Sequence, residues 1–217
     1  MISHNFTLSA LSKQGFEAKQ NTRLFPLQAL QEHSTGILYN HTTNTLKYDW
    51  LELSGVQAPT FQMLLDNNAL SETGTAKFIG LDIDPDVISG CIEHYSQPHL
   101  RHLQEWHTGN LEALLERKNA FPNVGVLVYD TEDGIWRGKW DNLQRVTQYA
   151  LRQYEKLGEF LLVINVVADP RFATSMSIQR YCDKLSELTG ARVKPDSLHR
   201  YTSKKSPMLW TMITFGF

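Results

Sequence analysis

Acidic side chains stand directly after two of the most apolar segments of the chain. Asp82 and Asp84 close the run KFIGLDID, and Asp130 closes NVGVLVYD, with Glu132 and Asp133 just behind it. Such runs are typical of buried parallel strands, whose carboxyl ends are where open α/β sheets bind ligands. A carboxylate there can accept hydrogen bonds from both hydroxyls of a ribose, or act as a general base. We therefore expect these acids to lie at a ligand site.

Each of these acids also has a simpler interpretation. Asp84 directly precedes Pro85 and an apolar helical pattern, so it is well placed to cap that helix. The trio of Asp130, Glu132 and Asp133 could hold a hard cation, which prefers oxygen ligands, or could be a solvated loop. The sequence leaves these alternatives open.

The composition is that of an ordinary globular domain. The chain has 217 residues, 41% hydrophobic and 20% charged, with a net charge of −2, so the whole molecule does not resemble a nucleic-acid binder. The only cysteines, Cys91 and Cys182, follow no metal-ligand spacing and suggest a reducing compartment. No segment has membrane-spanning length, and residues 1–20 lack the apolar core of a secretory signal. We expect a cytoplasmic protein.

Strand-like and helix-like segments alternate from Lys47 onward. The expected strands are 47–55, 77–84, 101–107, 123–130 and 159–169, and the expected helices are 59–68, 85–95, 110–118, 140–158 and 174–190. This alternation predicts a doubly wound, parallel α/β sheet with helices on both faces. Residues 197–203 and 208–217 look like two further strands, joined by a loop short enough for an antiparallel pair.

Residues 1–45 are less regularly patterned. A helix is expected after Pro26, and a turn at Thr42–Asn44 between two apolar runs. We interpret residues 1–45 as an N-terminal extension that packs on a core domain of residues 46–217.

Five strand–helix units followed by a β-hairpin resemble the class I S-adenosylmethionine-dependent methyltransferase fold, over roughly residues 47–217. The resemblance implies a mostly parallel, seven-stranded sheet whose last strand is antiparallel and inserted beside the fifth. It also implies S-adenosylmethionine as the methyl donor.

The resemblance assigns donor-binding roles at three strand ends. GLDIDP is similar to the family's second-strand motif, which makes Asp82 the ribose ligand, with Asp84 as an alternative. After the first strand the family has an acidic residue and a glycine-rich turn; here LELSGVQAP offers Glu52 and only Gly55. Glu52 would contact the methionine part of the donor, or only help to hold the loop.

The third and fourth strand ends complete the expected pocket. Asn110 and Leu111 are candidate adenine contacts, although Asn110 could instead cap the next helix. Tyr129 and Asp130 are expected over the pocket where donor and acceptor meet, with Asp130 as the catalytic residue. Trp136 is expected near the substrate.

The acceptor is not evident from motifs. The sequence lacks the Pro-Pro-aromatic, Pro-Cys and Lys-Asp-Lys-Glu signatures of three nucleic-acid methyltransferase classes. A weaker likeness, through YDWLELSG and FIGLDID, is to the three-Cys-motif partner proteins of mobile elements. The alternatives are a catalytically inactive protein of this fold that binds a partner, and a nucleotide-dependent oxidoreductase, which needs a G-x-G-x-x-G turn that is absent.

Basic residues gather in the tail. Arg192 and Lys194 are expected at the carboxyl edge of the sheet, where they could meet the phosphates of a nucleic-acid acceptor, and the SKKSP turn at the opposite edge. A solvated turn whose lysines discourage edge pairing is the simpler interpretation. The histidines of the middle third are expected to be scattered on the surface; they are His94, His99, His102 and His107.

Overall fold

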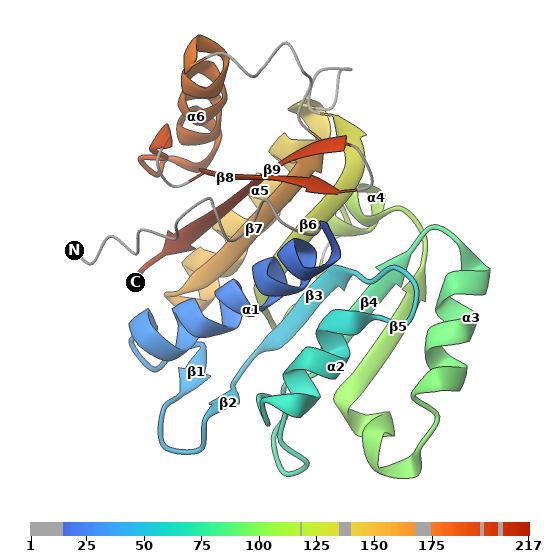
Figure 1. The fold of residues 1–217 in the computed structure, drawn as a ribbon. Coiled ribbons are helices and arrows are strands. Elements are labelled where there is room, and N and C mark those ends of the chain that lie inside the picture. The colour runs from blue at the N-terminus through green and yellow to red at the C-terminus, as the bar shows by residue number, and fades with distance from the viewer. Residues whose placement is uncertain (1–14, 118, 135–139, 168–174, 196–197, 204–205) are drawn as a thin grey trace.

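A seven-stranded sheet forms the centre of the protein in a computed structural model, which describes residues 15–117, 119–134, 140–167, 175–195, 198–203 and 206–217 (Figure 1). The strands lie in the order β5-β4-β3-β6-β7-β9-β8. Their bounds are Asp49–Leu53 (β3), Phe78–Asp82 (β4), Gln104–Thr108 (β5), Val124–Gly134 (β6), Phe160–Val167 (β7), Leu198–Ser203 (β8) and Ser206–Phe215 (β9). A separate two-stranded hairpin pairs Tyr39–Asn40 (β1) with Thr45–Leu46 (β2).

The strand directions confirm the expected fold class. The pairs β3–β4, β3–β6, β4–β5 and β6–β7 are parallel, whereas β9 is antiparallel to both of its neighbours. The last strand is therefore inserted beside β7, the fifth strand of the expected core, and β8 completes the sheet on its far side.

Helices cover both faces of the sheet. They are Gly15–His33 (α1), Pro59–Asp66 (α2), Pro85–His94 (α3), Leu111–Leu115 (α4), Trp140–Leu157 (α5) and Ser175–Thr189 (α6), with a 3-10 helix at Pro98–Leu103 (η1). In Figure 1, α1, α2 and α3 lie in front of the sheet and α5 behind it. Each face has its own apolar core, one with α4, α5 and α6 and the other with α1, α2 and α3.

The elements follow the hydrophobic pattern. Strand β7 consists of Phe160, six aliphatic residues and Asn165, and seven of its eight residues are buried. Helix α5 buries one stripe, which includes Leu143, Val146 and Ala150. The helix ends at Leu157, and the φ of 86° at Gly158 suits a residue that directly follows a helix.

The N-terminal extension shares the core of the sheet. The expected helix after Pro26 is too short, because α1 begins at Gly15 and runs through the proline. Leu27 and Leu30 of α1 are fully buried in the same cluster as Trp50 of β3. The division into an extension of residues 1–45 and a core domain of residues 46–217 stays a prediction.

Glu159, immediately before β7, holds the segment that follows α1. Its buried carboxylate accepts hydrogen bonds from Ser34 Oγ (2.7 Å) and from the backbone N–H groups of Leu38 (3.1 Å) and Thr35. Burial raises the pKa of Glu159, but these hydrogen bonds outweigh it, so the pKa lies below its ordinary value. The carboxylate is thus a charged anchor between the extension and the sheet.

The expected placement of the basic tail was wrong. Strand β8 runs parallel to β7, because both are antiparallel to β9. Helix α6 connects β7 to the parallel strand β8, so it must return the chain to the amino edge of the sheet. Arg192 and Lys194 lie between α6 and β8 and therefore approach β8 from that edge. The turn between Ser203 and Ser206 lies at the carboxyl edge instead; Lys204 and Lys205 themselves lie outside the described residues.

Candidate functional site

The strand register places Asp82 and Asp130 at the same level of the sheet. Glu52 of β3 lies opposite Gly80 of β4 on one side and Val128 of β6 on the other. Asp82 and Asp130 each follow two residues later, so the end of β3 lies between them. Two interstrand spacings separate their backbones by about 10 Å. A ligand of nucleoside size laid across the end of β3 can therefore meet both carboxylates.

Asp82 ends β4, as expected. Its Oδ1 accepts a hydrogen bond from the Asp84 N–H at 2.9 Å, and its carbonyl oxygen accepts one from the Gly109 N–H at 2.9 Å. Among the residues that the structure describes, the other carboxylate oxygen, Oδ2, has no hydrogen-bond partner. The side chain is only partly buried, so this oxygen is available to a ligand.

Asp84 and Asn110 both cap helices. Asp84 Oδ1 accepts from the Asp86 N–H at the start of α3, and Asn110 Oδ1 accepts from the Ala113 N–H at the start of α4, each at 2.9 Å. Leu111 is 1% exposed, so only its backbone can face a ligand. The capping interpretations are confirmed, whereas donor binding by these three residues stays a prediction.

The loop after β3 departs from a glycine-rich turn. Gly55 has φ 58°, and a β-carbon there would meet nothing within 4 Å, so the backbone is open to a ligand. Gln57 (φ 61°) and Ala58 (φ 37°) carry side chains in the left-handed region, which costs about 1–3 kcal/mol each. An observed strain of this kind is a reason to suspect function at the loop.

Two aliphatic side chains extend the rim of this loop. Val56 after β3 and Ile83 after β4 are each 73% exposed, which is unusual for large apolar residues at neighbouring strand ends. Val56 follows Gly55 and Ile83 follows Asp82, so both could contact the flat face of a ligand whose hydroxyls bind the carboxylate.

Glu52 points to the face of the sheet that α1 and α2 cover. Its carboxylate accepts hydrogen bonds from Trp50 Nε1 (3.0 Å) and Thr60 Oγ1 (2.7 Å), and the residue is 4% exposed. Burial raises its pKa to about 7, although both hydrogen bonds and the charge of Arg23 lower it. Glu52 therefore ties β3 to α2, which favours its interpretation as a residue that holds the loop.

Asp130 has neighbours that sequence reasoning missed. Its Oδ1 accepts a hydrogen bond from Asn165 Nδ2 of β7 at 2.9 Å. A cavity of about 20 Å³, enough for one water molecule, is bordered by Asp130, Asn165, Glu52 and Arg23 of α1. Asn165 had a signal, since it interrupts an aliphatic strand, whereas nothing in the sequence of α1 distinguishes Arg23.

Other expected residues lie elsewhere. Strand β6 does not end at Asp130 but continues to Gly134 through an irregular register. Tyr129 is 3% exposed and donates a hydrogen bond to Glu112 Oε1 at 2.6 Å, so its side chain belongs to the core between the sheet and α4. Trp136 and the side chains of Glu132 and Asp133 lie outside the described residues.

The described residues contain no cluster of three or more His, Cys, Asp or Glu side chains arranged to hold a metal ion. Within the same residues, every helix is too short or too polar to cross a lipid bilayer.

Comparison with known proteins gives the fold and not the family. Neither a family model nor a curated protein matches the sequence. Among solved structures, a possible exported protein from Bordetella parapertussis matches with a TM-score of 0.51 at 10% identity, over 100% of this chain and 74% of that one. A candidate RNA methyltransferase from Pyrococcus horikoshii matches with a TM-score of 0.50 at 11% identity, over 91% of this chain and 85% of that one.

The strand order and these matches define the class of protein. The chain has a class I methyltransferase-like fold, with a Rossmann-like α/β sheet.

Proposed function

We propose that the protein is an S-adenosylmethionine-dependent methyltransferase that binds its donor across the ends of β3, β4 and β5. One observation carries the proposal: Asp82 ends β4 with an available carboxylate oxygen, beside the open backbone of Gly55. A carboxylate that accepts two hydroxyl groups forms charge-assisted hydrogen bonds, which are shorter and stronger than neutral ones. The methyltransferase-like fold supports the choice of donor without testing it.

Asp130 is the proposed catalytic residue. It lies at the level of Asp82 but on the far side of β3, which is where an acceptor would approach the methyl group. Its hydrogen bond from Asn165 fixes the orientation of the carboxylate. A positioned carboxylate can remove the proton that an amine or hydroxyl acceptor loses on methylation.

A second candidate function is partner binding without turnover. The strained, side-chain-bearing positions Gln57 and Ala58 favour it, because a donor loop gains from glycine wherever the backbone must adopt φ above 0°. Ser54 and Val56 stand in the same loop and add β-carbons near the proposed donor.

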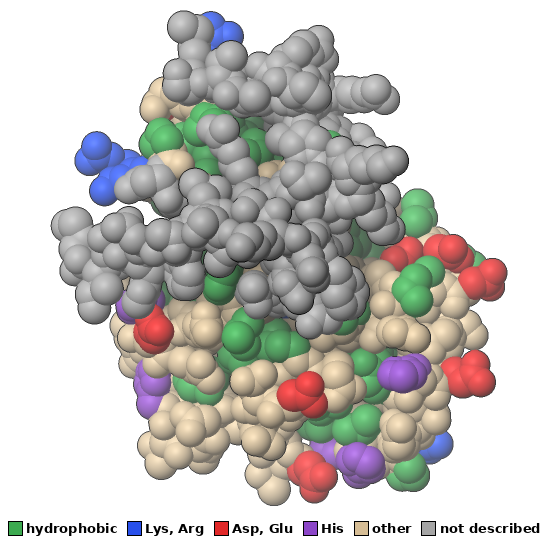
Figure 2. Space-filling view, viewed as in Figure 1, with side chains coloured by type: hydrophobic (Ala, Val, Ile, Leu, Met, Phe, Trp, Pro, Cys, Tyr) green, Lys and Arg blue, Asp and Glu red, His purple; other side chains and the backbone are tan. Residues whose placement is uncertain are grey.

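A nucleic-acid acceptor has less support. Arg192 and Lys194 approach β8 from the amino edge, away from Asp82 and Asp130. Figure 2 shows that the described part of one face carries acidic and histidine side chains over the region of α2 and α3, with lysines and arginines only at its margin. This distribution does not favour a polyanion at that part of the surface.

Donor binding is tested by calorimetry with S-adenosylhomocysteine, the demethylated product. We expect saturable binding, and a rise in melting temperature that grows with ligand concentration by mass action. No binding of either the donor or the product would refute the methyltransferase proposal. Binding without methyl transfer to any fraction of a cell extract would favour the partner-binding alternative.

Asp130→Asn should separate binding from chemistry. Asparagine can still accept the hydrogen bond from Asn165 but cannot take a proton, so product affinity should stay within a few-fold while methyl transfer falls about 100-fold or more. The measurement is transfer of labelled methyl groups, with Asp141→Asn on the exposed start of α5 as the control. Equal turnover in Asp130→Asn and the unmodified protein would remove Asp130 from the chemistry.

A further inference from the structure

A second concave site lies at the opposite end of the strands from Asp82. A groove of about 670 Å³ opens at the beginnings of β3, β4 and β5. Its floor is Ile79, which belongs to the core on the α4–α5 face. In the described residues of the crossover between β5 and β6, the one helix is the five-residue α4, so this part of the sheet is left uncovered. The volume is within the range of small-molecule sites.

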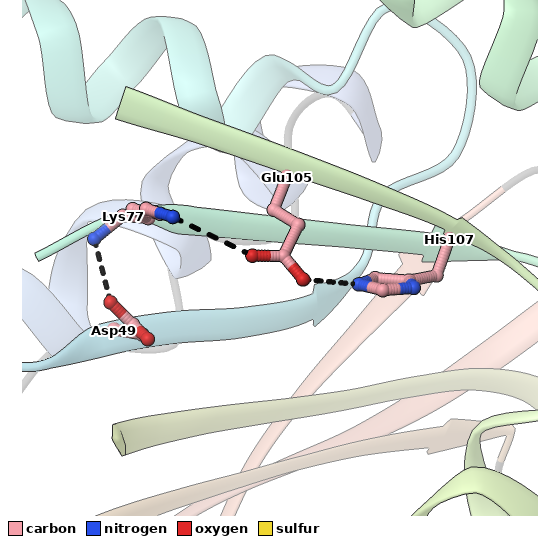
Figure 3. A network of polar contacts seen from close by, with 4 residues as sticks. All are labelled: Asp49, Lys77, Glu105 and His107. Atoms are coloured by element: carbon pink, nitrogen blue, oxygen red, sulfur yellow. Dashed lines mark hydrogen bonds and ion pairs between the residues drawn. The ribbon is translucent and has the colours of Figure 1, made fainter. Parts of the chain in front are cut away.

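Ionisable residues from three neighbouring chain segments line this groove (Figure 3). Lys77 Nζ lies 3.8 Å from Glu105 Oε2, and the other oxygen of Glu105 lies 2.7 Å from His107 Nε2. The Lys77 N–H donates to Asp49 Oδ1 at 2.8 Å. On a sheet face that a helix covers, residues at these positions would be apolar. Here they are polar, and core packing does not account for that.

The carboxylate of Asp49 uses one of its two oxygens within the network. Its Oδ2 has no hydrogen-bond partner within the part of the chain that the structure describes. Partial burial raises the pKa of Asp49 to about 6, although the N–H and charge of Lys77 lower it. Above that pH, the charged residues of the groove are two carboxylates, Asp49 and Glu105, against the single Lys77. The net charge of the groove favours a cation.

Phe121 supplies an aromatic wall in a costly conformation. Its φ is 45°, an outlier for a bulky residue, and its carbonyl oxygen is held by the Tyr149 hydroxyl at 2.7 Å and Gln153 Nε2 at 3.4 Å. The ring lines the groove and contacts the ring of His107, with centroids 5.1 Å apart. Hydrogen bonds from α5 therefore maintain a strained loop that presents an aromatic ring beside carboxylates.

We propose that this groove binds a small organic cation, an amine whose ammonium group is held by Asp49 and Glu105 against the ring of Phe121. Carboxylates next to an aromatic face are the chemistry that recognises ammonium groups. The site is separate from the proposed donor site, because it opens on the α4–α5 face of the sheet from the beginnings of β3 and β4, and only His107 lies near the level of Asp82. Ligand there would contact β5, the strand that leads directly to Gly109 and Asn110.

The test uses methylammonium and tetramethylammonium as probes, with the neutral tert-butanol for comparison. Binding is followed by NMR, through the backbone amide signals of Lys77, Glu105 and Phe121. We expect saturable shifts with both cations and none with the alcohol. Both cations carry the positive charge, but only methylammonium donates hydrogen bonds, so loss of a carboxylate charge should weaken both cations and methylammonium the more.

Two variants probe the two parts of the site. Asp49→Asn keeps an acceptor for the Lys77 N–H and removes the charge, and Phe121→Leu keeps an apolar side chain and removes the aromatic face. Each should weaken tetramethylammonium binding about five-fold or more, whereas Glu93→Gln, at an exposed position of α3, should not. Donor-site affinity should be unchanged in all three. If Phe121→Leu does not fold, as judged by its melting curve, Asp49→Asn alone carries the test.

Affinity should also fall as the pH is lowered through about 6. Asp49 then loses its charge; Lys77, Glu105 and Tyr149 are the other charged or titratable groups near it, and His102 and His107 line the same groove. No saturable shift with either cation, equal shifts with tert-butanol, or affinity indifferent to Asp49→Asn would overturn the proposal.

Discussion

Asp82→Ala should abolish measurable binding of S-adenosylhomocysteine while leaving the protein folded. Each hydrogen bond to a charged group contributes about 1.5–3 kcal/mol. Loss of two such bonds to the ribose therefore lowers affinity by at least about 100-fold. The folded state should change little, because Asp82 is partly exposed and, within the described residues, its side chain bonds only the Asp84 N–H.

The affinity is measured by calorimetry, with circular dichroism and a melting curve to establish folding. Asp82→Asn is the matched variant, because it keeps an acceptor for the Asp84 N–H and removes only the charge; it should also lose most of the affinity. Asp86→Ala, which removes an exposed carboxylate four residues after Asp82 in the first turn of α3, should bind as the unmodified protein does. Undiminished affinity in Asp82→Ala would show that the donor, if bound, is held elsewhere.

Glu159→Ala should cause the largest loss of stability, about 3–5 kcal/mol. The substitution leaves the Ser34 hydroxyl and the backbone N–H groups of Thr35 and Leu38 without their acceptor. Each buried donor without a partner costs about 1–3 kcal/mol. This is a large part of the total for a domain, about 5–15 kcal/mol. Urea unfolding measures the difference, and Glu155→Ala, exposed on α5, is the control.

The same carboxylate should make stability depend on pH. The folded pKa of Glu159 lies below its ordinary value of 4.5, so its contribution is fully present above pH 4.5 and is lost as the pH falls through the folded pKa. The unmodified protein should therefore lose more of its unfolding free energy on acidification than Glu159→Ala does. Parallel pH profiles for the two proteins would contradict this role for the charge.

The sequence predicts most of the sheet because its strands are buried on both faces. The near-continuous aliphatics of residues 123–130 and 159–169 and the stripe of 140–158 leave little choice of element, and all three are confirmed. Pro26 misled the prediction of α1, since burial of Leu27 and Leu30 outweighs the disfavoured proline in a helix.

The side chains that meet at each site were harder to predict, because they come from different strands and only the strand register brings them together. Asp82 and Asp130 could be placed from strand ends alone. The Asn165 hydrogen bond to Asp130 depends on the pairing of β6 with β7, and the groove depends on the polar residues of three strands facing one side. Glu105 and His107 are two positions apart on β5 and carry no motif, so their hydrogen bond could not be predicted from the sequence.

The position of β9 has a consequence for how the chain folds. β9 is made after β8 but lies between β8 and β7, so β8 has no place in the sheet until β9 has been synthesised. A nascent chain that ends after Ser203 therefore exposes the edge of β7 and leaves α1 without β8, the strand on which it packs. Pairings between distant parts of a chain form slowly. We therefore expect α1 at one end of the chain and β8 and β9 at the other to pack together, late in folding. The intermediate in which the edge of β7 is exposed should be the one most prone to aggregate.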